Sequence, residues 1–222
     1  MALMSAVDDA IRRISHALGR PAPPDAPPRP PDIDEHIARL VHTELGLSEL
    51  FARMAADECH MDVECIAADD LAPALASYIG RRSCRRIGLA DSPLLDSLGV
   101  YAALRQAGLN ARPWAQLTLD EAYDLDCGVT DVYAAVAETG SIVIRPWAGH
   151  GRALSLVPPL HIAIVHPKDI VADLIDLMDK LRGAPAASAA IIISGPSKTA
   201  DIEMTLVHGV HGPETVKVYL LR

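Results

Sequence analysis

One stretch decides the predicted fold: Ile191-Ile192-Ile193-Ser194-Gly195-Pro196-Ser197-Lys198-Thr199-Ala200-Asp201-Ile202-Glu203. Its apolar run stops at a Gly-Pro-Ser turn, and the polar residues after the turn are typical of the start of a helix. Open α/β sheets hold ligands with a strand, a tight polar loop and a helix N-terminus in this order. We therefore expect residues 190–193 to form a strand that delivers the turn to the carboxyl edge of a parallel sheet, and residues 199–208 to form a helix.

The predicted elements on either side alternate between helix and strand, which favours an α/β fold with a largely parallel sheet. The aromatic content of only 4% predicts an aliphatic core, as buried parallel strands provide. Asp69 or Asp70 is expected to cap one helix, and Ser92-Pro93 to start another. Strands are expected at residues 62–67, 86–90, 141–144, 160–165 and 215–221, and helices at 34–58, 69–80, 92–108, 131–137 and 169–182.

A proline-rich run divides the chain into two parts. Residues 5–18 have the apolar spacing of an amphipathic helix. Seven of the 17 prolines then fall within residues 21–31, so this run is an extended spacer rather than a helix or a central strand. The expected organisation is an N-terminal helix and tether over residues 1–32 and a single α/β domain over 33–222. The helix either packs back on the same chain or docks a partner or a second subunit.

Composition excludes several classes of protein. The formal net charge of −9 argues against nucleic-acid binding, which usually needs a basic face. The four cysteines include no C-x-x-C pair, and the acidic residues around 120–126 have no regular ligand spacing, so no metal site is expected. No run approaches the ~18 apolar residues of a membrane span, and Asp8 and Asp9 interrupt any signal-like segment. We expect a cytoplasmic protein, and a homo-oligomer is compatible with the sequence.

The Gly-Pro-Ser-Lys turn has the composition of an anion site. Gly195 allows close approach of the backbone, Ser197 and Thr199 are candidate N-caps, and Lys198 adds a positive charge. Asp201 would lie in the first helical turn, where it opposes a second anion. The turn is not a Walker A loop, because Ser197 stands where that loop requires glycine.

Three polar turns in the second half are predicted to converge on one edge: residues 138–140, 195–199 and 211–213. In particular, Glu138, Lys198, Asp201 and His211 are expected to share one pocket. Glu138 and His211 are the candidate catalytic residues. The candidate ligand-binding residues are Thr139, Gly140, Gly195, Pro196, Ser197, Lys198, Thr199, Asp201 and Gly212.

Several of these motifs together resemble one known family. The segments at 137–140, 155–161, 194–203 and 209–213 are similar, in order and spacing, to the LutC/YkgG lactate-utilisation family. The resemblance implies a three-layer, Rossmann-like, mostly parallel sheet of the NagB/RpiA/CoA-transferase-like group, with an N-terminal helical extension. It also implies a part in oxidising L-lactate to pyruvate with two partner proteins. One partner family carries iron–sulfur motifs, so no cofactor is expected in this chain.

Three hypotheses for function stay open at this point. In the first, the chain is a non-redox subunit of an L-lactate-oxidising system that binds an anionic small molecule or helps to assemble iron–sulfur partners. In the second, it is a stand-alone enzyme for a phosphorylated, CoA-linked or folate-like substrate, with Glu138 as acid, base or nucleophile. In the third, it is a structural or regulatory partner that uses the turns as interfaces. The sequence leaves open whether the chain is itself catalytic.

Overall fold

The structure is a computed structural model that describes residues 2–19, 45–202, 205–208 and 211–222, with side chains described for 8–19, 45–198 and 211–222. The chain divides into two units, Met1–Leu40 and Val41–Arg222. In the first unit, helix α1 (Ala2–Ala17) confirms the predicted N-terminal helix. The proline-rich run lies outside the described residues. None of the helices in the described ranges has both the length and the apolar composition that a membrane crossing needs.

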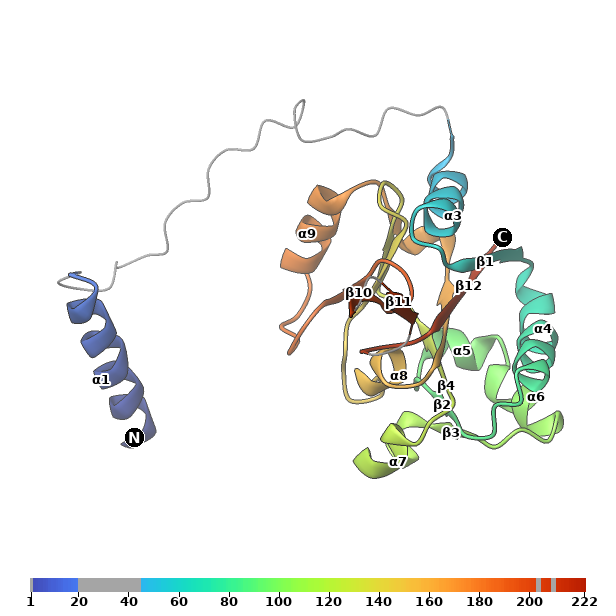
Figure 1. Ribbon diagram of the computed structural model, residues 1–222, viewed down its shortest axis with the longest axis horizontal. Helices are drawn as coiled ribbons and strands as arrows, with labels where there is room; N and C mark the ends of the chain where they lie inside the picture. Colours follow the sequence, from blue (N-terminus) through green and yellow to red (C-terminus); the bar gives the residue numbers. More distant parts are fainter. Residues whose placement is uncertain (1, 20–44, 203–204, 209–210) are drawn as a thin grey trace. The chain divides into compact units, whose positions relative to one another are not determined.

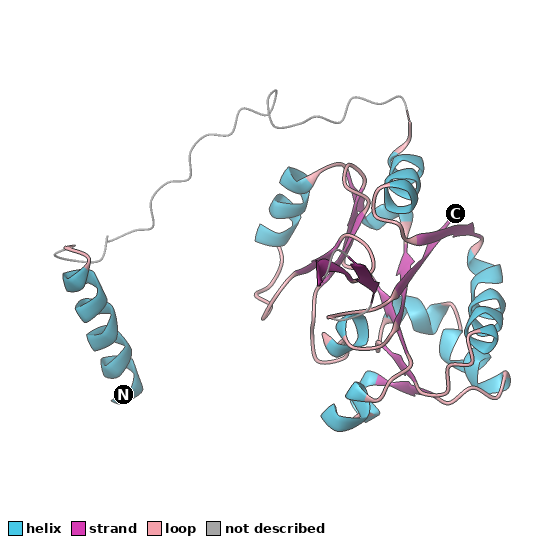
Figure 2. Cartoon of the chain, viewed as in Figure 1, coloured by secondary structure: helices cyan, strands magenta, loops and turns pink. Residues whose placement is uncertain are grey.

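A six-stranded parallel sheet forms the centre of the second unit (Figures 1 and 2). It confirms the α/β class and four of the strands expected from the sequence, at 62–67, 86–90, 160–165 and 215–221. Residues 141–144 also form a strand, but in another sheet. The strands, in spatial order, are β1 (Asp62–Ile66), β12 (Thr215–Leu221), β7 (Leu160–Val165), β4 (Cys127–Asp131), β2 (Ile87–Leu89) and β3 (Ala111–Pro113).

Alternate residues of the central strands enter two different cores, as the period of two in a strand requires. Ile162 and Ile164 of β7 pack in one cluster, whereas Ala163 and Val165 pack in the other. The first cluster contains the buried faces of the helices on one side of the sheet. These helices are α4 (Ala68–Arg81), α5 (Pro93–Ser97), α6 (Val100–Gln106), α7 (Leu119–Tyr123) and α8 (Ala153–Leu156), and a 3₁₀ turn, η1 (Trp114–Gln116), precedes α7.

The opposite face of the sheet is covered by helix α3 (Leu47–Asp57) and by a second, four-stranded sheet. This sheet continues from the carboxyl ends of β4 and β7, and helix α9 (Leu174–Arg182) packs on it. Its strands, in spatial order, are β8 (Ile170–Val171), β5 (Ala134–Val136), β6 (Ser141–Ile144) and β9 (Ile191–Ile193). A 3₁₀ turn, η2 (Pro167–Asp169), leads from β7 into β8.

The stretch that led the sequence prediction folds differently from the expectation. Strand β9 exists, but it pairs antiparallel with β6 in the second sheet and not with the parallel sheet. The helix expected over residues 199–208 is wrong, because β10 (Lys198–Ile202) and β11 (Thr205–His208) form an antiparallel hairpin. The segment 199–202 alternates polar and apolar residues as a strand does, and this pattern prevails over the capping signal.

Other boundaries also differ from the expectation. The helix predicted at 131–137 is strand β5, because a short Ala/Val run is ambiguous between helix and strand. Helix α4 begins after Ala67 without a side-chain cap, so neither Asp69 nor Asp70 caps it. Ser92 does cap α5, but Gly99, with φ 64°, separates α5 from α6. Helix α9 begins after Asp173, whose side chain accepts a hydrogen bond from the Asp176 amide. Of the helix expected over 34–58, residues 34–44 lie outside the described ranges.

Candidate functional site

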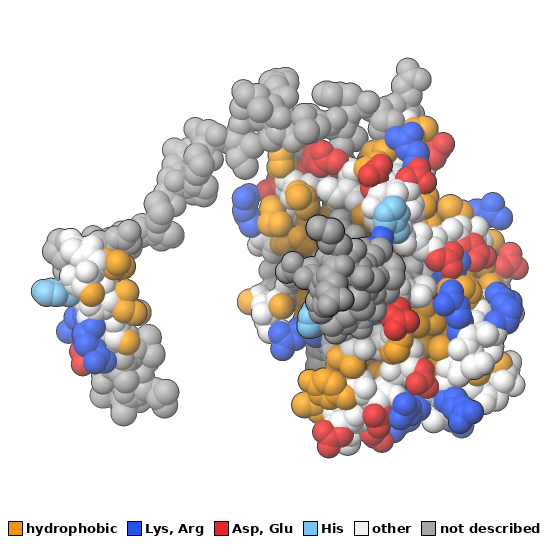
Figure 3. Space-filling model, in the orientation of Figure 1, with side chains coloured by type: hydrophobic (Ala, Val, Ile, Leu, Met, Phe, Trp, Pro, Cys, Tyr) orange, Lys and Arg blue, Asp and Glu red, His pale blue; other side chains and the backbone are white. Residues whose placement is uncertain are grey.

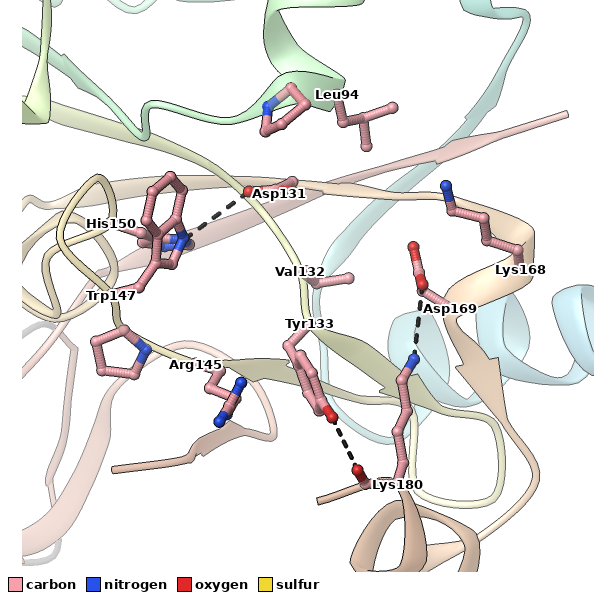
Figure 4. A pocket seen from close by; sticks show the side chains of 12 residues that line it. Leu94, Asp131, Val132, Tyr133, Arg145, Trp147, His150, Lys168, Asp169 and Lys180 are labelled. Atoms are coloured by element: carbon pink, nitrogen blue, oxygen red, sulfur yellow. Dashed lines mark hydrogen bonds and ion pairs between the residues drawn. The ribbon is translucent and has the colours of Figure 1, made fainter. Parts of the chain in front are cut away.

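A cavity lies at the point where the connections of the parallel sheet change direction. β2 and β4 are neighbours in the parallel sheet. From β2 the chain connects to β3 on one side of this pair, and from β4 it connects to β7 on the other side. In open α/β sheets, ligands bind at the carboxyl ends of the strands at such a point. There the second unit has a crevice of about 430 Å³ (Figure 4), which we call the switch-point crevice. The residues that argue for its chemistry are Asp131, Tyr133, Arg145, His150, Lys168 and Lys180.

Asp131, the last residue of β4, organises one wall of this crevice. Its Oδ2 accepts a hydrogen bond of 2.7 Å from the hydroxyl of Ser92, the residue that caps α5. Its Oδ1 lies 3.8 Å from Nδ1 of His150, a distance that suits an ion pair rather than a hydrogen bond. Asp131 thereby joins the loop after β2 to the loop after β6, and the three side chains meet although 58 residues separate the outer two.

His150 is a buried base with one uncommitted nitrogen. The residue is 3% exposed, and its Nε2 has no hydrogen-bond partner among the described residues. Burial lowers the pKa of His150 below 6.5, and the Asp131 carboxylate opposes this effect. The residue lines the crevice but its unpaired Nε2 is buried, so this neutral imidazole can exchange a proton or a hydrogen bond with a ligand once a side-chain movement exposes that nitrogen.

A second histidine lies behind the first. His161 of β7 is fully buried, and its Nε2 lies 2.9 Å from the Thr130 hydroxyl. Burial, with a smaller contribution from the charge that His150 would carry, lowers the pKa of His161 to about 3. Its Nδ1 is the other buried side-chain atom without a hydrogen-bond partner in the described part of the chain. His161 was expected at the start of a strand, and it is neutral there at physiological pH.

The opposite wall of the crevice is cationic. The ring of Tyr133 lies between the guanidinium of Arg145, 5.3 Å from its centroid, and the ammonium of Lys180, at 5.1 Å (Figure 4). Lys180 also pairs with Asp169 at 3.6 Å. Among the described residues, neither Arg145 nor the exposed Lys168 has an acidic side chain within ion-pair distance. Figure 4 shows these two cations on opposite sides of the crevice, so each can balance the charge of an anionic group at its own side.

A tight loop holds His150 in place. The backbones of Trp147 and His150 exchange hydrogen bonds of 3.2 and 2.9 Å, and the Asp91 amide donates to the Gly149 carbonyl at 2.7 Å. A Cβ at Gly151 would collide with the indole of Trp114. The glycines of this loop thus allow close packing that fixes a histidine.

The predicted ligand-binding turns do meet, but at another place. The amide of Ser197 donates to the Pro213 carbonyl at 2.8 Å, and the Ser197 hydroxyl accepts from the His211 amide at 3.3 Å. The turn at 138–140 is linked through Ser141, whose hydroxyl lies 2.8 Å from that of Thr139 and 2.7 Å from that of Ser194. We call the residues 138–141, 194–198 and 211–213 the turn cluster.

The turn cluster lies at the amino end of β12, whereas the switch-point crevice lies at the carboxyl ends of β2, β4 and β7. The turns were expected at the carboxyl edge, and this placement is wrong because β9 is not a strand of the parallel sheet.

The individual residues of the turn cluster show mainly backbone packing. Gly140, with φ 67°, and Gly195, with φ 117°, have conformations that favour glycine. A Cβ would collide with the backbone of α3 at Gly140 and with the Cys59 carbonyl at Gly195. Glu138 and Pro196 are half-buried, Lys198 and His211 are exposed, and Gly212 is half-buried beside Ser197.

The side chains of Thr199 and Asp201 lie outside the described set, so the shared pocket of Glu138, Lys198, Asp201 and His211 stays a prediction. None of the turn-cluster residues lines the switch-point crevice.

The acidic residues near position 120 have structural contacts. Glu121 forms a capping box with Thr118 and pairs with Arg112. The Thr118 amide first, and then Arg112, lower the pKa of Glu121 to about 2. Asp126 accepts the amides of Arg85 and Arg86 at 2.9 and 2.8 Å. Across the described residues, no three His, Cys, Asp or Glu side chains are grouped as metal ligands.

Comparison with known proteins places these features in a family. Residues 51–221 match the family described as the LUD domain. Lactate utilization protein C of Exiguobacterium is 32% identical over 96% of this chain and 95% of the relative. Lactate utilization protein C of Halalkalibacterium halodurans is 30% identical over 75% of this chain and 76% of its own length. The Escherichia coli protein YkgG is 30% identical over 95% of each chain.

A solved structure supports the fold. The crystal structure of a DUF162 family protein from Deinococcus radiodurans superposes with a TM-score of 0.56, over 80% of this chain and 99% of that one. At 23% sequence identity, this likeness concerns the fold alone.

Proposed function

Because the chain belongs to the family of LUD-domain proteins, we propose that it acts in lactate utilisation, as a non-redox subunit that binds a small anion in the switch-point crevice. The single observation that supports the lactate role most strongly is the similarity, over nearly the whole chain, to a protein named for lactate utilisation. In this proposal the iron–sulfur centres belong to partner proteins, and this chain contributes the anion site and the contacts for assembly.

The crevice suits a carboxylate better than the turn cluster does. Arg145 offers two parallel N–H donors that match the two oxygens of a carboxylate, and Lys168 adds positive charge at the other side of the crevice. Of the five fully charged side chains that line the crevice, three are cationic and two, Asp131 and Asp169, are acidic. Asp131 is turned toward Ser92 and His150, and Asp169 toward Lys180, so the acids have partners other than the ligand.

His150 gives the crevice a group that can act on a hydroxyl or keto oxygen beside the carboxylate. Its Nε2 is buried and lacks a partner, the backbone hydrogen bonds of its loop hold the residue, and the Asp131 carboxylate lies 3.8 Å from Nδ1. In this proposal His150 holds or moves one proton of the ligand, and Asp131 and Ser92 are positioning residues.

Growth on L-lactate tests the proposed role. The coding region is deleted in a host that carries no second gene of this family, and growth is compared on L-lactate and on pyruvate. We expect growth on L-lactate to be lost and growth on pyruvate to be kept, with rescue by the intact gene. Rescue should fail with Arg145→Met and succeed with Arg105→Met, because Arg105 is exposed on α6 and does not line the crevice. Normal growth of the deletion strain on L-lactate would overturn the proposal.

The alternative of a stand-alone enzyme for a phosphorylated, CoA-linked or folate-like substrate leads to the opposite result. It predicts unchanged growth on L-lactate and turnover by the purified chain without partners. Co-purification separates the two further, since the proposed subunit should bring down an iron–sulfur protein that shows the visible absorbance of its clusters.

A further inference from the structure

A second hollow adjoins the switch-point crevice and shares Pro146, Trp147 and His150 with it. This hollow, which we call the aromatic groove, has a volume of about 530 Å³. Trp114, Leu119, Tyr123 and Leu156 line it. Apolar side chains gather over α7, at the lower end of the second unit in the view of Figure 3, and this helix supplies Leu119 and Tyr123.

Aromatic side chains are concentrated around these two hollows. The sequence contains only two Trp, five Tyr and one Phe. Both Trp residues and Tyr123 line the aromatic groove, and Trp147 and Tyr133 line the crevice. Trp147 is 55% exposed and Tyr123 is 65% exposed. Large exposed aromatic surfaces beside a cavity mark a place where another flat or apolar group packs.

Charge and size narrow the ligand. The crevice supplies Arg145 and Lys168, and the groove adds the exposed Arg152. The crevice alone, at about 430 Å³, has room for roughly 14 waters at ~30 Å³ each. Lactate has only six heavy atoms, so it leaves most of the crevice and all of the aromatic groove unfilled.

We propose that the crevice and the aromatic groove together bind an anion that carries a planar ring, with the ring on Trp147 and the anionic group against Arg145, which Figure 4 shows on the same side of the crevice as Trp147. Nucleoside phosphates and heteroaromatic carboxylates share this chemistry. The proposal rests on the proposed function for the anion site, which it deepens by naming the class of ligand. It does not depend on whether the chain is catalytic.

Isothermal titration calorimetry on the full chain tests the proposal with six probes. AMP and ATP represent nucleoside phosphates, nicotinate and pteroylglutamate represent heteroaromatic carboxylates, and inorganic phosphate and L-lactate lack a ring. We expect at least one ring-bearing anion to bind at least tenfold more tightly than both ring-free anions. If only the nucleoside phosphates or only the heteroaromatic carboxylates bind, that group of probes identifies the chemical class of the ligand. If no ring-bearing anion binds, or if none binds more tightly than phosphate or lactate, the proposal is overturned.

Variants locate the bound ring. Trp147→Leu keeps apolar bulk but removes the stacking surface. It should therefore lower the affinity for the ring-bearing anion about 5- to 150-fold, as loss of one base–aromatic contact does. Arg145→Met should lower the affinity for the same anion because it removes a positive charge from the crevice. Arg105→Met is the matched control and should leave this affinity unchanged. Unchanged affinity in both Trp147→Leu and Arg145→Met would place the ligand elsewhere and overturn the proposal. Melting temperatures within about 2 °C of the parent show that the variants are folded.

Fluorescence gives an independent readout, because both tryptophans of the sequence line the aromatic groove. A ring that stacks on Trp147 should quench the emission, and the quenching should persist in Trp114→Phe. Saturable binding without quenching in this variant would overturn the stacking arrangement.

The outcomes also separate this proposal from the proposed function. Lost growth on L-lactate without binding of a ring-bearing anion would leave the lactate role intact and overturn this inference. Normal growth of the deletion strain on L-lactate, together with binding of a ring-bearing anion, would overturn the lactate role and leave this inference intact.

Discussion

The turn cluster and the switch-point crevice differ in how their residues are recruited. The turn cluster consists of short, distinctive motifs such as Gly-Pro-Ser-Lys. Its glycines allow close contacts with the backbone of α3 and of Cys59, where a Cβ would collide. The crevice collects single residues from several helices, strands and loops between positions 93 and 180 and contains a buried histidine with an unpaired nitrogen. A distinctive motif can thus reflect backbone packing, whereas a ligand site can be assembled from residues that form no motif.

Gly140→Ala should have the largest effect, and it tests the packing role of the turn cluster. The left-handed conformation costs about 1–2 kcal/mol for a residue with a Cβ, and overpacking adds about 1–3 kcal/mol. Urea unfolding should therefore show a loss of about 2–5 kcal/mol. The control is Gly80→Ala in α4, where a Cβ meets open space, and it should stabilise by about 0.5–1 kcal/mol. If Gly140→Ala is as stable as its parent, the glycine is there for a ligand and not for packing.

His161→Gln tests the electrostatics behind the crevice. The pKa of His161 is about 3 in the folded chain and about 6.5 in the unfolded chain. The unfolded state therefore binds more protons between these values, and stability is lost as the pH falls below about 6.5 at up to ~1.4 kcal/mol per pH unit.

Removing the imidazole removes this part of the pH dependence. Between pH 6.5 and 5, the stability of the parent should fall by about 2 kcal/mol more than that of His161→Gln. Glutamine keeps a polar partner for Thr130. Parallel stability curves for the two proteins would show that His161 titrates normally and would contradict the neutral buried state.

Arg145→Met and Lys198→Met compare the two regions directly as anion sites. Loss of one charge-assisted contact should weaken binding of L-lactate about tenfold, or about 1.4 kcal/mol, in Arg145→Met. Lys198 is exposed and does not line the crevice, so its variant should bind within about twofold of the parent. Calorimetry that shows the larger loss in Lys198→Met would return the site to the turn cluster.

Ser92→Ala should have the smallest effect on stability and separates capping from positioning. Losing an N-cap costs about 1 kcal/mol, and Thr118→Ala, which removes the cap of α7, is the matched control. Only Ser92 donates to Asp131, so Ser92→Ala alone should also weaken anion binding and change its dependence on pH. Equal binding by the two variants would exclude a positioning role for Ser92.

Four of the six strands of the parallel sheet could be predicted, and the clearest signal is a short apolar run such as that of β7. The six residues Leu160–Val165 are all buried, as a central parallel strand requires. The Ser-Pro start of α5 was also predictable, because the cap and the fixed φ of proline act locally. The errors fall where local signals compete, as in the hairpin β10–β11, whose capping residues suggested a helix.

The crevice could not be predicted, because no local pattern joins its residues. Asp131 is the last residue of β4 but was assigned to a helix, whereas Tyr133, Arg145, Lys168 and Lys180 gave no signal of their own. One clue was present, since polar residues at the carboxyl ends of parallel strands converge. Which strands are neighbours depends on the order of the crossover connections, and no short segment of the sequence specifies that order.

The position of β12 has a consequence for synthesis of the protein. Lys217 of β12 is 4% exposed and pairs with Asp62 and Glu64 of β1 at 3.0 and 2.9 Å. Along the chain, Asp62 precedes Lys217 by 155 residues and Glu64 precedes it by 153 residues. On the ribosome, β1 emerges long before the strand that separates it from β7, and at about 5–20 residues per second that interval lasts roughly 8–30 seconds. Until β12 follows, β1 and, once it has emerged, β7 lack the strand that pairs with both of them in the folded chain.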